Sequence, residues 1–393
     1  MAEKAERFVV TYRVTPDDSR PIEAHAKDIC LEETVEIPED AVPAGHWEAG
    51  LVGVVESIDA CARVSIDAPQ DYDVKISYRV DITNHQIANF INVLFGNISI
   101  RRGIKIVDIA FTPSQAKAFG GPRKGIAGLR AALGVHGRPL AITAIKPMGL
   151  SARDLAALCG GYAQGGLDII KDDHGLIDQH FHPFEERVAR IMDAVRDANA
   201  KTAHTTHYYP MVAGPFAELE KQFSYAKAQG CFGVLIAPML IGLDAGFSLA
   251  RKYDLAVMTH PTFTGTHFHD PRHGMTPAIL LGTLFRVFGA DISVFPNYGG
   301  RFTFSKQECV DLADALRGPL FDLSPAFPAP AGGMVIEKVS AMLDVFGSDT
   351  VLLIGGALLR YSPDPVVSAR AFVQAIEQAV AQNARDDQRG KVK

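Results

Sequence analysis

The most concentrated group of potentially reactive side chains in the sequence is the run Lys171-Asp172-Asp173-His174. It closes a predicted strand, Leu167–Lys171. Side chains alternate along a strand, so Lys171 and Asp173 should face one side and Asp172 the other, while His174 can turn in from the loop. Carboxylate oxygens and imidazole nitrogens bind divalent cations, whereas an ammonium group does not. Lys171 could join such a site only after CO₂ converts its amine into a carbamate. An ion pair of Lys171 with Asp172 or Asp173 is the alternative, and the run alone leaves both open.

Two further side chains follow apolar stretches of the same kind. Lys146 comes directly after Leu140–Ile145, and His260 ends Leu255–His260. Burial and a nearby cation both disfavour an ammonium group, so Lys146 could serve as a base, with a salt bridge as the alternative. His260 could hold a substrate oxygen or transfer a proton.

Glycine pairs follow the last two predicted strands, in Ala331-Gly332-Gly333 and Gly355-Gly356. Backbone N–H groups at such positions of an α/β barrel bind phosphate, although glycine pairs also form ordinary tight turns. Two pairs at corresponding positions favour a phosphorylated substrate.

The elements that must position these residues begin at residue 140, where short apolar strands alternate with amphipathic helices. This pattern indicates a parallel sheet covered on both faces. Eight such units in one segment predict a (β/α)₈ TIM barrel, with a doubly wound open sheet as the alternative, and a barrel places its active site at the C-terminal strand ends. The eight expected strands are Leu140–Ile145, Leu167–Lys171, Thr202–Thr206, Gly233–Ala237, Leu255–His260, Ile292–Phe295, Phe321–Ser324 and Val351–Ile354.

The N-terminal part has a different pattern, in which apolar residues mostly alternate with polar ones. It predicts strands interrupted by two helices, one beginning at Pro21 and one near Asn84, in a small ferredoxin-like α+β domain. We expect this domain over residues 1–125, the barrel over 126–382 and a flexible tail over 383–393, with the Gly/Pro-rich Phe119–Pro139 as the link. The expected strands are Arg7–Val14, Leu51–Glu56, Ala62–Ile66, Val74–Val80 and Ile104–Phe111.

Composition excludes several classes of protein. The 393 residues carry a net charge of −6, with 47% hydrophobic and 21% charged residues, as in soluble globular proteins. The mild acidity gives no reason to expect nucleic acid or membrane as a partner, and no apolar run could span a bilayer. The five cysteines are widely spaced without a C-x-x-C, and no secretory signal precedes the first strand. These features favour a reducing, cytoplasmic location.

Two motifs at this spacing are highly specific: Lys146-Pro147-x-Gly149-Leu150-Ser151, and Gly165-Gly166-Leu167-Asp168-x-x-Lys171-Asp172-Asp173. Together they resemble the large subunit of RuBisCO and its RuBisCO-like (form IV) relatives. The similarity extends over nearly the whole chain and includes the FxGPxxGIxxLRxxLGVxGRPL link and His273-Gly274-Met275.

The resemblance implies a role for each matching residue. Lys171 would be the carbamylated lysine that binds Mg²⁺ and Asp173 a second ligand, while Lys146 would handle the proton at enolisation. His260 would contact substrate, and the glycine pairs would bind phosphate. Glu32 and Asn97 would reach the site of a neighbouring subunit, which implies a homodimer or an assembly of dimers.

Departures from the family pattern argue against carboxylation. His174 stands where a second carboxylate ligand is expected, Met148 replaces a lysine, and Pro261 replaces a phosphate-binding arginine. The loop Asn297–Arg301 has no lysine to position CO₂. We therefore expect a singly phosphorylated substrate, with Arg301 meeting its other end.

The same departures leave the first half of the family's chemistry, Mg²⁺-dependent formation of an enediolate, in place. C–C cleavage or decarboxylation of a phosphorylated 3-oxo sugar acid, of the 3-oxo-isoapionate 4-phosphate type, is the main expectation because an acidic substrate suits a less anionic site. The alternative is an enolase or isomerase of methylthio sugar phosphates from methionine salvage.

Two rival classes remain at this point. A zinc hydrolase could use nitrogen ligands from histidines elsewhere in the barrel segment, although related hydrolases take two of them from the first strand, which here ends in Lys146. A non-catalytic paralogue that only binds a sugar phosphate would have no physical need for the charged groups retained around one barrel mouth. The histidines that a zinc hydrolase would use are His204, His207, His267 and His269.

Overall fold

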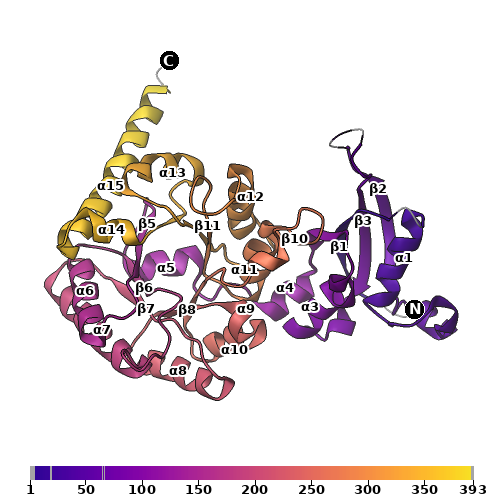
Figure 1. Ribbon diagram of the computed structural model, residues 1–393, viewed down its shortest axis with the longest axis horizontal. Coiled ribbons are helices and arrows are strands. Elements are labelled where there is room, and N and C mark those ends of the chain that lie inside the picture. The colour runs from indigo at the N-terminus through magenta and orange to yellow at the C-terminus, as the bar shows by residue number, and fades with distance from the viewer. Residues whose placement is uncertain (1–4, 18–19, 64, 66, 391–393) are drawn as a thin grey trace. The chain divides into compact units, whose positions relative to one another are not determined.

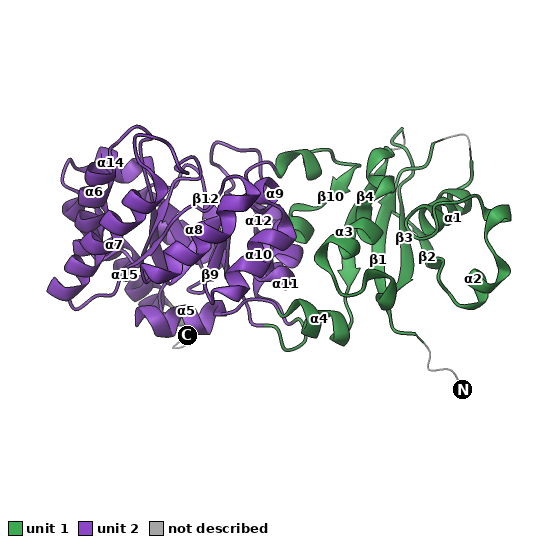
Figure 2. Ribbon diagram, turned by 90° about the horizontal axis from the view of Figure 1, so that it is seen from below, with its two compact units in different colours: residues 1–120, 264–280, 320–323 green, residues 121–263, 281–319, 324–393 purple. Residues whose placement is uncertain are grey.

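The computed structural model describes residues 5–17, 20–63, 65 and 67–390 (Figure 1). The chain forms two compact units, which Figure 2 colours separately. Unit 1 contains the residues up to Gly120 together with 264–280 and 320–323, and unit 2 contains 121–263, 281–319 and the residues from Ser324 onward. Two short pieces of the C-terminal part of the chain therefore belong to unit 1.

Unit 1 has the ferredoxin-like topology expected from the sequence. Its strands lie in the order β10-β4-β1-β3-β2, and the pairs among β4, β1, β3 and β2 are antiparallel, whereas β10 runs parallel to β4. The chain order strand–helix–strand–strand–helix–strand with this arrangement confirms the prediction. The main elements are β1 (Arg7–Val14), α1 (Ile22–Glu32), β2 (Val54–Ala60), β3 (Tyr72–Arg79), α3 (Ile87–Phe95), β4 (Ile104–Ala110) and β10 (Gly274–Met275).

Alternation of apolar side chains builds the core of unit 1. Phe8, Val10 and Tyr12 of β1 are fully buried, and the Tyr12 hydroxyl donates to the Leu94 carbonyl at the end of α3 (2.9 Å). The expected strand over 62–66 is not formed at Ala62, Arg63 or Ser65, while residues 64 and 66 lie outside the described residues. The shorter elements are η1 (Glu39–Ala41), α2 (Ala44–Glu48), η2 (Val80–Thr83), η3 (Asn97–Ile100), α4 (Pro113–Phe119) and η4 (Gly265–His267).

Unit 2 is the expected α/β barrel, with eight parallel strands in the part of the chain that the structure describes. They form two ladders, β13-β5-β6-β7 and β12-β11-β9-β8. Met211, just after β7, bridges to Leu235 of β8, and all eight strands contribute side chains to one hydrophobic core. The strands are β5 (Leu140–Ile145), β6 (Ile169–Asp172), β7 (His207–Tyr209), β8 (Gly233–Ile236), β9 (Ala256–Thr259), β11 (Ile292–Pro296), β12 (Phe327–Ala331) and β13 (Val351–Ile354).

Helices surround these strands, as Figure 1 shows for α6, α7, α8 and α10. Their starts follow local capping signals: Ser305 Oγ accepts from the Glu308 amide (3.2 Å) while Glu308 accepts from the Ser305 amide (2.8 Å), which begins α12. No helix among the described residues is long and apolar enough to cross a membrane. The helices are α5 (Gly125–Leu133), α6 (Ala152–Gln164), α7 (Phe184–Lys201), α8 (Phe216–Ala228), α9 (Pro238–Ile241), α10 (Leu243–Lys252), η5 (Ala278–Leu284), α11 (Phe285–Phe288), α12 (Lys306–Arg317), η6 (Ile336–Lys338), α13 (Val339–Phe346), α14 (Gly356–Tyr361) and α15 (Pro365–Gly390).

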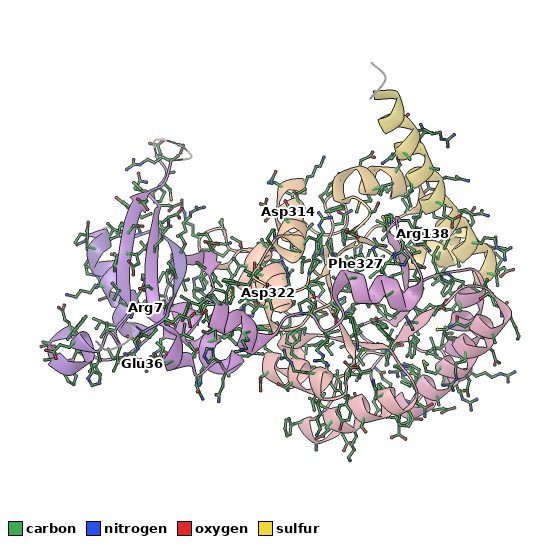
Figure 3. All side chains as sticks on the ribbon, turned by 180° about the vertical axis from the view of Figure 1, so that it is seen from behind. Arg7, Glu36, Arg138, Asp314, Asp322 and Phe327 are labelled. Carbon is green, nitrogen blue, oxygen red and sulfur yellow. The ribbon has the colours of Figure 1, made fainter. Side chains whose placement is uncertain are left out.

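Two of the eight barrel strands lie later in the chain than expected. The third is β7 rather than 202–206, because the latter stretch is polar and mostly accessible, whereas Tyr208 and Tyr209 are buried. The seventh is β12 rather than 321–324, despite prolines at 328 and 330. The Phe327 amide donates to the backbone carbonyl of Asp291, just before β11 (2.9 Å). Alternate residues of β12 therefore form that ladder, and the prolines fall on the other side of the strand. Figure 3 labels Phe327 at the start of this strand.

The glycine-rich link and the predicted C-terminal tail both contain helical residues. The link contains helix α5, whose Ile126, Leu129 and Leu133 join the barrel core. The Asp291 carboxylate accepts from the amide of Gly125 at its start (2.7 Å). At the other end, α15 continues through residues 383–390 of the predicted tail. Residues 391–393 of that tail lie outside the described residues.

Candidate active site

The first two barrel strands bring a lysine and an aspartate into contact at their C-terminal ends. Ile145 of β5 pairs with Asp172 of β6, so the residues that follow, Lys146 and Asp173, stand side by side. Lys146 Nζ lies 2.6 Å from Asp173 Oδ2, which is the kind of salt bridge that the sequence left open as the alternative role of Lys146. Burial alone would raise the pKa of Asp173, but His174 and Lys146 outweigh it, and the pKa lies below its usual value. Asp173 is therefore an anion at the barrel mouth.

Lys171 is a buried amine in the same place. Its residue is only 2% exposed, and Nζ donates to the Asp172 carbonyl (3.0 Å). Burial, with a contribution from the positive charge of Lys146, lowers the pKa of Lys171 to about 8, although Asp173 acts in the opposite direction. Among the described residues neither Asp172 nor Asp173 forms an ion pair with Lys171 Nζ, so the alternative of an ion pair filling the barrel is not the arrangement found.

Asp172 faces away from this group, as the alternation of side chains predicts. Its carboxylate accepts from Tyr208 Oη (2.7 Å), from the Met211 amide (2.9 Å) and from Arg187 Nε (3.2 Å), and both charged residues are fully buried. The Asp172 carboxylate is therefore hydrogen-bonded within the wall of the barrel, where it links β6 to β7.

Two histidine rings complete the group at the mouth. The rings of His174 and His260 stack with their centroids 4.2 Å apart. His260 Nδ1 accepts from the Thr262 amide (3.2 Å), which leaves the ring proton on Nε2. Burial, followed by the charge of Lys171, lowers the pKa of His260 well below its usual value, so the ring is neutral. His174 Nδ1 lies 3.4 Å from Asp173 Oδ1.

The predicted phosphate-binding glycines lie on two separate loops. A Cβ at Gly355 would stand 3.7 Å from Lys146 Cε, so the start of α14 borders the lysine. Gly332 and Gly333 have φ of +91° and +82°, which side chains rarely adopt. A Cβ at Gly300 would lie 2.2 Å from the Gly332 carbonyl, so the loop after β11 rests on the loop after β12 backbone to backbone.

Arg301 and Met148 stand on two different loops, those after β11 and β5. Arg301 directly follows Gly300, and its guanidinium lies 5.5 Å from the centroid of the Phe302 ring. Met148 is 54% exposed, and a Cβ at Gly175 would stand 2.9 Å from its terminal methyl group. The loop after β5 therefore covers the loop after β6 with an apolar side chain, next to His174.

In unit 1 the structure joins two predicted site residues that the sequence separates by 65 positions. Asn97 Nδ2 donates to Glu32 Oε1 (3.0 Å), and Arg101 Nη2 pairs with Glu32 Oε2 (3.0 Å). Sequence reasoning missed Arg101 and also Glu33, whose carboxylate accepts from the amides of Gly96 and Ile98. The acidic doublet at the end of α1 was the available signal for Glu33.

The histidines of the zinc alternative are used elsewhere. His204 Nε2 lies 3.3 Å from Asp168 Oδ1, before β6 and β7 begin, and His207 stacks on Phe232 at 4.7 Å. Both are at the strand ends opposite to Lys146, and His267 and His269 belong to unit 1. Across the described residues, no three His, Cys, Asp or Glu side chains are grouped so that they could hold a metal ion.

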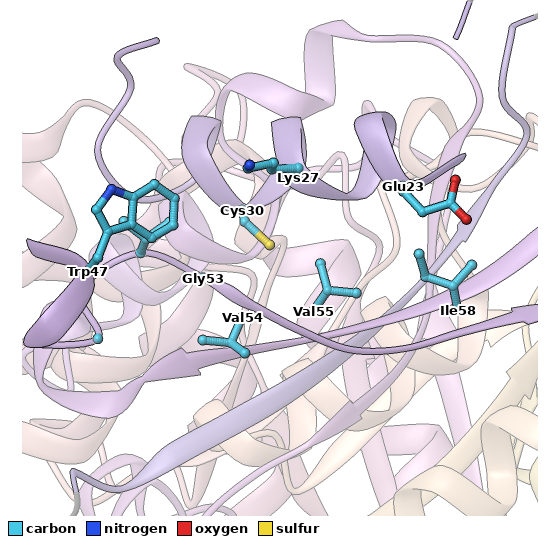
Figure 4. A pocket seen from close by; sticks show the side chains of 10 residues that line it. Glu23, Lys27, Cys30, Trp47, Gly53, Val54, Val55 and Ile58 are labelled. Carbon is cyan, nitrogen blue, oxygen red and sulfur yellow. The ribbon is translucent and has the colours of Figure 1, made fainter. Parts of the chain in front are cut away.

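Unit 1 also contains two hollows. A cavity of about 490 Å³ lies between α1 and β2, with Cys30 and Trp47 among its mostly apolar lining (Figure 4). Burial raises the pKa of the Cys30 thiol to about 12, which makes it a poor nucleophile. A polar hollow of about 1400 Å³ includes Arg101 and Asp28 in its lining. None of the predicted barrel residues lines either one.

Comparison with known proteins agrees with the motifs. Residues 125–391 match the family described as ribulose bisphosphate carboxylase large chain, catalytic domain. The chain is 38% identical over 373 residues to ribulose bisphosphate carboxylase-like protein 1 of Rhodopseudomonas palustris, covering 95% of this chain and 98% of the relative. It is 36% identical over 380 residues to 5-methylthioribulose-1-phosphate isomerase of Rhodospirillum rubrum, covering 96% and 98%.

A solved structure extends the likeness to the fold. The crystal structure of a RuBisCO-like protein from Rhodopseudomonas palustris superposes with a TM-score of 0.84 at 37% identity, covering 95% of this chain and 98% of that one. The family match spans more than half of the sequence and the relatives match it from end to end. The chain therefore belongs to the RuBisCO large-chain family, as one of its RuBisCO-like proteins.

Proposed function

We propose that this protein isomerises a methylthio sugar phosphate by enolising the carbon next to its carbonyl group. The observation that carries the proposal is the Lys146–Asp173 contact beside the buried amine of Lys171. The name of the Rhodospirillum rubrum relative, 36% identical over 96% of this chain, supports the isomerase alternative. C–C cleavage of a phosphorylated 3-oxo acid stays a prediction without such support.

The residues at the mouth fit a magnesium ion if Lys171 is carbamylated. Asp173 is anionic, and a lysine with a pKa of about 8 is partly neutral at physiological pH, which is the form that reacts with CO₂. Carbamate and carboxylate oxygens suit this hard cation, with His174 as a third candidate ligand. When bound, the ion would polarise the substrate carbonyl and so acidify the neighbouring carbon.

The other residues at the mouth suit distinct tasks in this reaction. Lys146 is placed to remove or return the proton at carbon, and the neutral His260 can donate from Nε2 to a substrate oxygen. The backbone amides of Gly332, Gly333, Gly355 and Gly356 would bind the single phosphate, with Ala331 leading into the first pair and Arg301 at the other end of the substrate.

Two residues of unit 1 would complete the site of a neighbouring copy. Glu32 and Asn97 are hydrogen-bonded to each other, and Arg101 adds a charge-assisted contact, so the three form one preorganised polar group. We propose that the protein works as a homodimer, or an assembly of dimers, in which this group faces the barrel mouth of the partner.

The test is a substrate panel followed by phosphorus NMR. Purified protein is incubated with Mg²⁺ and bicarbonate and given 5-methylthioribulose 1-phosphate, a 2,3-diketo-5-methylthiopentyl 1-phosphate, or a phosphorylated 3-oxo sugar acid. The proposal expects conversion of the first compound by the wild type and none by Lys171→Ala. Turnover of the 3-oxo acid alone would instead support the cleavage reaction.

A further inference from the structure

Glu33 uses both oxygens of one buried carboxylate to hold a single turn of unit 1. Oε2 accepts from the Gly96 amide (2.6 Å) and Oε1 accepts from the Ile98 amide (2.8 Å). These amides lie at the junction between α3 and η3, where helix N–H groups lack partners of their own. Glu33 is only 5% exposed, so it is not placed to contact a ligand directly.

The residue between the two bonded amides is Asn97. Its side chain is directed outward and donates to Glu32 Oε1 (3.0 Å). The turn is tight on both sides: a Cβ at Gly96 would stand 2.4 Å from the Asn92 carbonyl, and Ile98 is fully buried. The carboxylate of Glu33 therefore fixes the peptide groups that set the direction of the Asn97 side chain.

Glu32 and Glu33, at the end of α1, make different kinds of contact. Glu32 is half-buried and pairs with Asn97 and Arg101, whereas Glu33, the residue that ends the helix, turns inward. A buried carboxylate is costly, and here burial raises the pKa of Glu33 to about 7 even though the Ile98 and Gly96 amides act in the opposite direction. A neutral apolar residue at this position would avoid that cost but could not hold the turn.

We propose that Glu33 is a positioning residue: by clamping the amides on both sides of Asn97, it holds the Asn97–Glu32 pair in the orientation that the catalytic site requires. This inference rests on the proposed function, which assigns Asn97 and Glu32 to the site of a neighbouring copy. Glu33 itself touches no substrate.

The test compares Glu33→Gln with Glu36→Gln, a matched control in which the same substitution is made at an exposed residue three positions on (Figure 3 labels Glu36). The glutamine amide places a donor against one backbone donor and so releases one side of the turn. Since displacements of about 1 Å cost on the order of 100-fold in rate, we expect a loss of that size in kcat/KM for Glu33→Gln and none for the control. Hydrogen exchange should rise in residues 95–101 alone.

A hybrid dimer of two different variants distinguishes the positioning role of Glu33 from a purely structural one. In a hybrid of Glu33→Gln with Lys171→Ala, one site combines an intact barrel with an intact Glu33 from the other chain, so activity should return. A hybrid no more active than its parents would overturn the inference, as would wild-type kinetics in Glu33→Gln. If Glu33→Gln does not fold, Glu33→Asp keeps the charge but is too short to reach both amides, and the same outcomes apply.

Failure of the proposed function gives a different result. In that case the wild type converts no substrate in the panel, while the rise in hydrogen exchange at residues 95–101 in Glu33→Gln is still measurable. Unchanged exchange there would contradict the clamp whatever the reaction is.

Discussion

Lys146 Nζ and Asp173 Oδ2 lie 2.6 Å apart, at the ends of adjacent strands in the barrel. Both side chains are partly accessible, and each stands next to a third group, Gly355 for the lysine and His174 for the aspartate. The contact therefore joins the predicted proton-transfer residue directly to the predicted metal ligand.

Replacing Lys146 should separate catalysis from stability. Lys146→Gln removes the group placed to move the proton, so we expect kcat to fall by about 10²- to 10⁴-fold. A partly exposed ion pair contributes only about 0–1 kcal/mol, so the free energy of unfolding should hardly change. Steady-state kinetics and chemical denaturation measure the two effects, with Lys201→Gln, at the exposed end of α7, as the control. Full activity in Lys146→Gln would remove the lysine from the mechanism.

Carbamylation of Lys171 should depend on pH in a defined direction. Its pKa is lowered to about 8, so the reactive neutral amine becomes more abundant as pH rises through that value. Activation by bicarbonate and Mg²⁺ should therefore increase with pH around a midpoint near 8. The carbamate carbon can be followed by NMR with ¹³C-labelled bicarbonate. No carbamate signal at any pH, or one that also persists in Lys171→Ala, would contradict this prediction.

The same buried lysine should reduce stability at neutral pH. A group whose pKa is lower in the folded state than in the unfolded state is easier to protonate when unfolded, so the stability of the protein rises with pH from about 8 towards 10.5. Lys171→Met should therefore raise the free energy of unfolding at pH 7 by up to about 3 kcal/mol while it abolishes activity. Denaturation curves at pH 7 and near pH 10 compare the two proteins. A variant less stable than the wild type at pH 7 would show that the amine is accommodated without cost.

Asp168, another residue of the second lysine motif, should prove structural. Asp168 is fully buried and accepts two hydrogen bonds from Arg138 (2.7 and 2.8 Å), which Figure 3 labels. Removing one partner of a buried pair costs about 3–5 kcal/mol, so Asp168→Asn should lower stability by that order while the folded fraction keeps its kcat. Asp193→Asn, on the surface of α7, is the control. A selective loss of kcat at unchanged stability would contradict this assignment.

Sequence patterns predicted the continuously apolar strands better than the short or proline-containing ones. Strands β5 and β13 have the expected bounds because their residues are continuously apolar, and alternation correctly separated Asp172 from Lys171. The pattern failed at β12, because prolines normally argue against a strand. They are compatible with β12 only because they face away from β11, and the sequence does not show which strand lies next to β12. The pattern also failed at β7, since only three residues form the strand.

Contacts over long sequence separations could not be predicted from the chain alone. The resemblance assigned Glu32 and Asn97 to one site, but their hydrogen bond and the clamp by Glu33 depend on how α1 packs beside η3. The stacking of His174 on His260 depends likewise on barrel closure, which brings β6 and β9 to one mouth. Residue types and spacing therefore suggested the chemistry, whereas the hydrogen-bond and stacking partners of these side chains became known only from the fold.

Deuterium exchange tests the central claim most directly. Wild-type protein with Mg²⁺ and bicarbonate in D₂O should incorporate deuterium next to the carbonyl of 5-methylthioribulose 1-phosphate and form its isomer, whereas Lys171→Ala should do neither. Binding of the compound by the wild type without any exchange or isomer would contradict enolisation at this site.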